Sequence, residues 1–147
     1  MQKQNGIRVE YNSLVVIWAA LLMSQAIFLV VIYLVKPGIF HLDAAAPPLG
    51  TQPLVTIVFA AAAVAFFVLS FILRRQHLKR AVIDKDQGCV QTGLVLGCAL
   101  SEIASIFGVI LAIAFGYHYF FLWIALGTLG ILLHFPRRST LDAAAGM

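Results

Sequence analysis

The chain has 147 residues, of which 62% are hydrophobic and only 11% are charged. Soluble domains are about 45–50% apolar, so this composition excludes a water-soluble globular fold and indicates an integral membrane protein. The formal net charge of +4 does not indicate a nucleic-acid partner, because the basic residues flank apolar segments and are typical of topology signals.

Four apolar segments follow one another along the chain. They cover residues 14–35, 54–73, 92–115 and 119–135. A helix rises about 1.5 Å per residue, so about 20 residues cross the hydrocarbon core; the first three segments are long enough and the fourth is short. Since a lone strand would leave its backbone groups unpaired in lipid, each segment is expected to be a helix. We therefore predict an all-α fold with a single domain, a transmembrane four-helix bundle over residues 1–147.

The basic residues lie almost entirely on one side of these segments. Nine of the ten Lys and Arg residues fall in the N-terminal tail, in the connection 74–91 or in the C-terminal tail, and Lys36 is the exception. The nine are Lys3, Arg8, Arg74, Arg75, Lys79, Arg80, Lys85, Arg137 and Arg138. By the positive-inside rule both termini are expected in the cytoplasm, in a multi-pass protein of a bacterial inner membrane. The connection 74–91 is expected to be a long solvated loop, the alternative being an amphipathic segment on anionic lipid headgroups.

Residues that usually carry catalysis or bind metals are scattered along the chain. Cys89, Cys98 and the four histidines have no metal-ligand spacing, and there is no glycine-rich phosphate loop and no nucleophile with a paired base. His134, beside the last basic cluster, is expected to be an interfacial anchor, with titration near neutral pH as its alternative role. The sequence therefore predicts no enzyme, no metal and no cofactor.

Glu102 is the one ionisable residue near the middle of a predicted span. It lies about 15 Å from the inner end of the third helix. A charge at this depth is costly in lipid, so the neutral carboxyl is favoured and the residue is a candidate proton-binding site. The alternative is that a neutral Glu102 only ties two helices together.

Polar partners for Glu102 are expected on the first and third helices. Gln25 lies at a similar depth, because both helices run outward from the same side of the membrane. Ser24, Ser101 and Ser105 lie close enough in sequence to join the same cluster, although serine in a membrane helix often bonds back to its own backbone.

Small residues recur along the third helix at four-residue spacing. Gly93 and Gly97 are followed by Ser101 and Ser105, with Gly108 close to the same stripe. Small residues at this spacing let two helix backbones approach closely, so these positions are expected to be packing contacts.

The third segment resembles the carboxylate-bearing helix of the ATP synthase c-subunit and V-type proteolipid family. The resemblance covers residues 97–110 and places Glu102 at the proton-carrying carboxylate, Phe107 at the aromatic and Gly108 at the following glycine. It implies that Glu102 binds a translocated proton. The chain departs from the family in its long basic connection and its two additional helices, so it is not expected to be an ordinary ring subunit.

The whole chain is similar to a group of uncharacterised four-helix bacterial inner-membrane proteins. The shared pattern is a first helix containing Gln25, the segment 99–102 and a final Pro136-Arg137-Arg138. This resemblance implies architecture but no activity. Two functions therefore remain open: a proton-binding, proteolipid-like subunit of an energy-coupling or transport complex, and a non-catalytic structural or assembly subunit in which Glu102 and Gln25 specify packing. The expected partners are the lipid bilayer and either further copies of the chain or a larger membrane complex.

Overall fold

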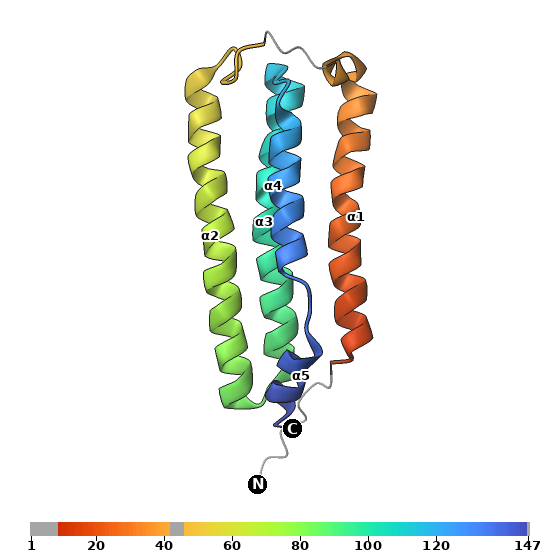
Figure 1. Ribbon diagram of the computed structural model, residues 1–147, viewed down its shortest axis with the longest axis vertical. Coiled ribbons are helices and arrows are strands. Elements are labelled where there is room, and N and C mark those ends of the chain that lie inside the picture. Colours follow the sequence, from red (N-terminus) through yellow and green to blue (C-terminus); the bar gives the residue numbers. More distant parts are fainter. Residues whose placement is uncertain (1–8, 42–45, 147) are drawn as a thin grey trace.

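The computed structural model describes residues 9–41 and 46–146, and these ranges contain helices and connecting segments but no strand (Figure 1). Four of the helices lie side by side and alternate in direction, and the last short helix lies at the same end as the start of α1. The elements are α1 (Tyr11–Val35), η1 (Pro37–Phe40), α2 (Pro53–Asp84), α3 (Gln87–Phe115), α4 (Phe120–Leu133) and α5 (Arg138–Ala145). The all-α prediction is confirmed.

Three of these helices, α1, α2 and α3, are long and apolar enough to cross a membrane. The fourth, α4, meets the same test only together with α5, and the two are bent by 45° at their junction. Large apolar side chains remain exposed on the outer faces, including Leu34 (73%) and Leu54 (75%). In water this surface would be very unfavourable, so the chain is a multi-pass membrane protein.

Helix α3 is the centre of the bundle. In its most apolar stretch 44% of the residues are buried, compared with 11% in α1 and 17% in α2. Helices α2 and α4 pack most extensively against α3, and α1 packs against α3 and α4. A side chain on α3 is therefore surrounded by protein on several sides, whereas most of α1 faces the surroundings of the bundle.

The connection after α2 is much shorter than predicted. Helix α2 continues to Asp84, and only Lys85 and Asp86 separate it from α3. The prediction of a long loop over 74–91 was wrong, because the change from apolar to basic side chains ends the apolar span but not the helix: Arg, Lys and Leu are all good helix formers. Lys85 ends α2 in the left-handed conformation (φ 51°), and the side chain of Asp86 accepts a hydrogen bond from the Gly88 N–H (2.8 Å) at the start of α3.

The other helix ends also differ from the predicted bounds. Helix α1 starts at Tyr11 and α3 at Gln87, each before the apolar span, whereas α4 covers only Phe120–Leu133. Helix α5 was not predicted, since its eight residues are too few for a membrane span and half of them are polar. Its buried residues Leu141 and Ala144 belong to an apolar cluster with α2 and α3. Lys3 and Arg8, which support the topology prediction, lie outside the described residues.

The buried apolar residues form two clusters at different levels of the bundle. One includes Leu111 and Trp123, and the other includes Leu14 and Leu94. On their own helices, Gln25, Ser70 and Ser101 each lie between members of the two clusters, and all three are buried. A polar layer therefore separates the two apolar halves of the core.

Candidate functional site

Glu102 extends from α3 toward α1 within this polar layer. Its carboxyl oxygen Oε1 is in hydrogen-bonding contact with Ser24 Oγ of α1. Neither side chain is sealed, since both are half-buried. The carboxyl therefore lies at a helix–helix contact, on a residue that keeps part of its surface open to the surroundings of the bundle.

The direction of the hydrogen bond between Ser24 and Glu102 depends on whether the Glu102 carboxyl is protonated. Ser24 Oγ also lies 2.6 Å from the Leu21 carbonyl oxygen, which can only accept. A hydroxyl has one hydrogen, so when Ser24 donates to Leu21 the contact with Glu102 requires a protonated carboxyl that donates to Ser24. When Glu102 is ionised, the Ser24 hydrogen must turn toward the carboxylate. The pair therefore has two hydrogen-bond arrangements, one for each charge state.

Gln25 connects this pair to the buried face of α3. Its amide Nε2 donates to Ser24 Oγ (3.4 Å), and its carbonyl oxygen accepts a hydrogen bond from the Ser105 hydroxyl (2.5 Å). Gln25 is 5% exposed and Ser105 is fully buried. The four side chains therefore form one chain of contacts, which we call the Glu102 cluster: Glu102, Ser24, Gln25 and Ser105.

Ser101, predicted as a fourth partner, lies outside the Glu102 cluster. Its hydroxyl donates to the Gly97 carbonyl of its own helix (2.9 Å) and lies 3.4 Å from Ser70 Oγ of α2. Ser70 was not singled out in the sequence, although a lone serine in an apolar helix is the signal that could have found it. Gln25 is linked to Glu102 through Ser24.

The glycines of α3 lie where other helices approach it. A β-carbon on Gly93 would lie 2.9 Å from His77 Cβ of α2, and one on Gly108 would lie 2.6 Å from Trp123 Cβ of α4. On α4, Gly127 faces Ser105 and Gly130 faces Ser101. The close backbone approach therefore places α4 in direct contact with Ser101 and Ser105 of α3.

His134 has a different place from the one predicted. It is fully buried rather than at an interface, and its ring lies against Gly97 and against the Phe71 ring (4.6 Å between centroids). Its Nδ1 lies 2.6 Å from the Gly130 carbonyl oxygen, so Nδ1 carries the hydrogen, and Nε2 has no hydrogen-bond partner among the described residues. Hydropathy could not reveal this burial, because it does not report which way a side chain at a helix end turns.

Arg74 holds the end of α4 next to this histidine. Its guanidinium donates from Nη1 to the Leu133 carbonyl (3.2 Å) and from Nη2 to the Phe135 carbonyl (3.1 Å). These carbonyls lie at the negative end of the helix dipole, where a cation is favourable. Arg74 therefore ties α2 to the end of α4.

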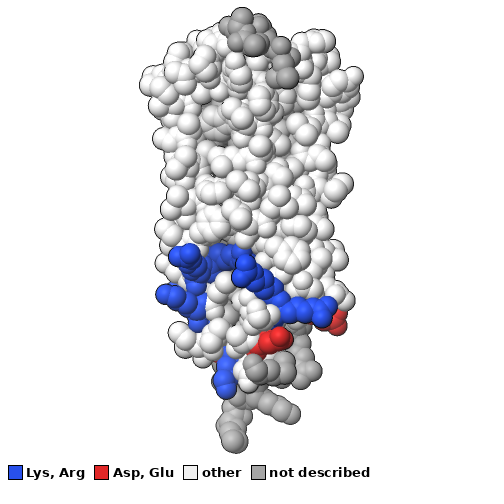
Figure 2. All heavy atoms as spheres, viewed as in Figure 1, with Lys and Arg blue, Asp and Glu red and all other residues white. Residues whose placement is uncertain are grey.

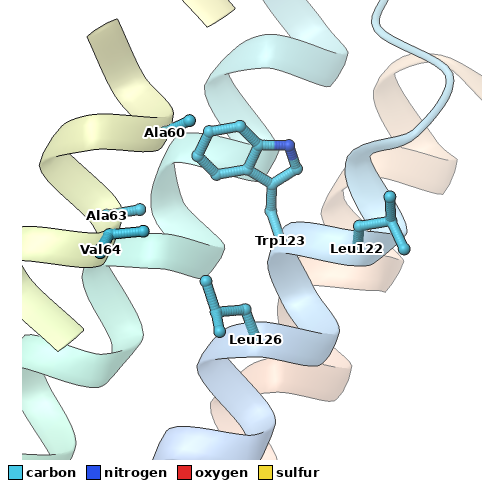
Figure 3. A pocket seen from close by; sticks show the side chains of 6 residues that line it. All are labelled: Ala60, Ala63, Val64, Leu122, Trp123 and Leu126. Carbon is cyan, nitrogen blue, oxygen red and sulfur yellow. The ribbon is translucent and has the colours of Figure 1, made fainter. Parts of the chain in front are cut away.

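Shallow apolar grooves lie on the surface of the bundle. One, of about 180 Å³, lies between α2 and α4 and has the Trp123 ring facing Ala60 and Ala63 (Figure 3). Another, of about 430 Å³, lies between α1 and α4 and is lined by residues such as Leu29 and Phe121. Glu102 lines neither groove, and the described residues contain no group of three His, Cys, Asp or Glu side chains that could hold a metal.

Comparisons of the chain with protein-family models, with curated proteins and with solved structures found no match.

Proposed function

We propose that the protein is a membrane subunit that binds and releases a proton at Glu102, as part of an energy-coupling or transport complex. The observation that carries the proposal is the contact between the carboxyl of the half-buried residue Glu102 and Ser24 in the polar layer. The local resemblance of residues 97–110 to the proteolipid helix points to the same residue. No catalytic role is proposed.

Reversible proton binding needs a carboxyl for which both charge states are supported. In lipid, a central charge such as Asp costs about 2.5–3.5 kcal/mol on insertion scales, so the neutral form is the resting one. Ser24 supports that form as an acceptor and the ionised form as a donor, and the partial exposure of the Glu102 residue leaves a path for a proton. A fully buried Glu102 would still have the support of Ser24 but would have no path for a proton.

The proposed topology has four spans with both termini in the cytoplasm of a bacterium. The basic residues of α2 and of the α4–α5 connection lie at one end of the bundle, as the positive-inside rule requires. At the other end the Tyr117 hydroxyl donates to the Pro48 carbonyl (2.8 Å) and Tyr119 to Ala46 (3.1 Å), as expected for interfacial aromatic residues. Helix α4 is about 21 Å long, so its span includes flanking residues.

A second candidate function is a non-catalytic structural or assembly subunit. The sealed hydrogen bond between Ser105 and Gln25 and the close contacts of the α3 glycines favour it, because they fix how α1, α3 and α4 pack. In that case Glu102 would be neutral at every pH at which the protein is folded. The two functions therefore differ in whether Glu102 titrates.

Infrared difference spectroscopy in lipid nanodiscs tests the proposal. The wild type should show the C=O band of a protonated carboxylic acid that disappears as pH is raised, and Glu102→Gln should lack this band. The matched control is Asp142→Asn, which removes an exposed carboxyl of α5 and should leave the band unchanged. A band that stays constant at every pH would favour the structural function, and a titrating band that survives in Glu102→Gln would reject Glu102 as the site.

A further inference from the structure

A band of basic side chains lies at one end of the apolar bundle. We call it the basic collar, and it comprises Arg74, Arg75, Lys79 and Arg80 of α2 with Arg137 and Arg138 at the start of α5. Figure 2 shows Lys and Arg gathered in a band directly below the uncharged body of the protein. The Asp and Glu side chains visible in this view lie at the same end, next to or below Lys and Arg side chains. The charged side chains visible in this view thus lie at one end of the bundle.

The collar has no carboxylate partners within the described part of the chain. No Lys or Arg nitrogen there lies within 4.0 Å of an Asp or Glu oxygen. The partners that exist are neutral: Arg74 donates to carbonyls of α4 and its terminus, and the Arg138 guanidinium lies over the Tyr11 ring (4.7 Å). Arg75, Lys79, Arg80 and Arg137 are exposed. Most of the positive charge of the collar is therefore free to meet an anion.

The surface directly above the collar is apolar and exposed. Ile72 (46%) precedes the bases of α2, and Leu133 (54%) and Phe135 (43%) precede those of the α4–α5 connection. A ligand that contacts both layers needs a hydrocarbon part and an anionic part next to each other. A phospholipid has this structure, whereas inorganic phosphate and nucleic acid lack the hydrocarbon part.

We propose that the basic collar binds the phosphate headgroups of anionic phospholipids, whose acyl chains lie on the apolar surface above it. Guanidinium groups are suited to this ligand because their fork of N–H donors matches two phosphate oxygens. Each Lys or Arg near an anionic lipid surface contributes about a fivefold gain in affinity. The proposal depends neither on the direction in which the protein crosses the membrane nor on the chemistry of Glu102.

The test measures binding of phosphatidylglycerol and phosphatidylcholine to the full-length protein by native mass spectrometry in mild detergent. Wild type should retain phosphatidylglycerol preferentially, and raising the salt concentration before measurement should reduce that retention. The triple variant Arg75→Gln, Lys79→Gln, Arg137→Gln should bind phosphatidylglycerol about 100-fold more weakly. Arg74 is left unchanged because it also holds α4.

Two controls separate charge at this place from other effects. The triple variant Arg75→Lys, Lys79→Arg, Arg137→Lys keeps the charge and should keep the preference, and Lys36→Gln removes a charge at the other end of the bundle and should also keep it. Equal retention of both lipids by wild type, or an unchanged preference in the neutral triple variant, would overturn the proposal. Loss of the preference on adding inorganic phosphate at the lipid's concentration would show a free-phosphate site instead, and would overturn it as well.

Discussion

Gly97 of α3 and His134 at the end of α4 pack so closely that a β-carbon at Gly97 would overlap the imidazole ring. Gly97→Leu should therefore push α4 away from α3 and lower the free energy of unfolding in detergent by about 1–3 kcal/mol, as overpacking does. The measurement is thermal or denaturant unfolding of the purified protein. Ile110→Leu on the exposed face of the same helix is the control and should be close to neutral.

A double-mutant cycle can show whether the imidazole is the obstacle. If it is, His134→Ala should restore much of the stability that Gly97→Leu removes, because the smaller side chain leaves room for the new one. Additive losses from the two substitutions would mean that Gly97 is constrained by something other than His134.

The sequence predicted the polar layer better than it predicted the connections. Depth along a helix follows directly from residue count, so Gln25 and Glu102 could be assigned similar depths without a structure. Which neighbour Glu102 contacts depends on how α1 is rotated about its axis, and the sequence does not define this rotation because α1 is apolar on nearly all sides. In the structure Ser24, and not Gln25, contacts the carboxyl. The buried His134 and the continuation of α2 to Asp84 depend on tertiary packing and on helix propensity, which hydropathy does not measure.

Ser105 and Gln25 form a sealed hydrogen bond between α3 and α1. Ser105→Ala should leave the Gln25 carbonyl buried without this donor and lower stability by about 1–3 kcal/mol. Thr128→Val is a matched control, since the Thr128 hydroxyl is half-buried and donates only to the Ile124 carbonyl of its own helix (2.7 Å). Equal effects of the two substitutions in detergent unfolding would contradict a specific role for the Gln25 bond.

Arg74 and Arg75 are adjacent but have different partners. Arg74 donates to two carbonyls at the end of α4, whereas Arg75 is exposed. In neutral detergent Arg74→Gln should therefore lower the free energy of unfolding by about 1–2 kcal/mol, and Arg75→Gln should change it by less than about 0.5 kcal/mol. A ranking in the opposite order would show that the cap of α4 does not contribute to stability.

The four-span topology predicts that the two ends of α2 lie on opposite sides of the membrane. In a background with Cys89 and Cys98 replaced by alanine, single cysteines at Thr51 and Asp84 place a thiol before and near the end of α2, at exposed positions. An impermeant thiol reagent should label Thr51→Cys in intact cells with the outer membrane permeabilised, and Asp84→Cys only after the inner membrane is opened. Equal labelling of both would reject the topology.

The contact between Ser24 and Glu102 predicts the direction in which loss of the Ser24 hydroxyl changes proton binding at Glu102. A hydrophobic carbodiimide reacts with protonated carboxyls in lipid, so its reaction with Glu102, followed by mass spectrometry, should slow as pH rises. Ser24 donates a charge-assisted hydrogen bond to the ionised carboxyl and only accepts a weaker one from the neutral carboxyl. Ser24→Ala therefore removes more support from the ionised form, and the reaction with Glu102 should continue to a higher pH than in the wild type.

Ser101→Ala is the control for this shift, because Ser101 lies on the same helix but bonds to Gly97 and lies near Ser70 rather than near Glu102. Its reaction profile should match that of the wild type, while Glu102→Gln should not be modified at this position at all. A downward shift in Ser24→Ala would mean that Ser24 stabilises the neutral carboxyl more than the ionised one, and the contact would then oppose proton release. An unmodified wild-type Glu102 at every pH would mean that the carboxyl is closed to the lipid, which the half-buried side chain argues against.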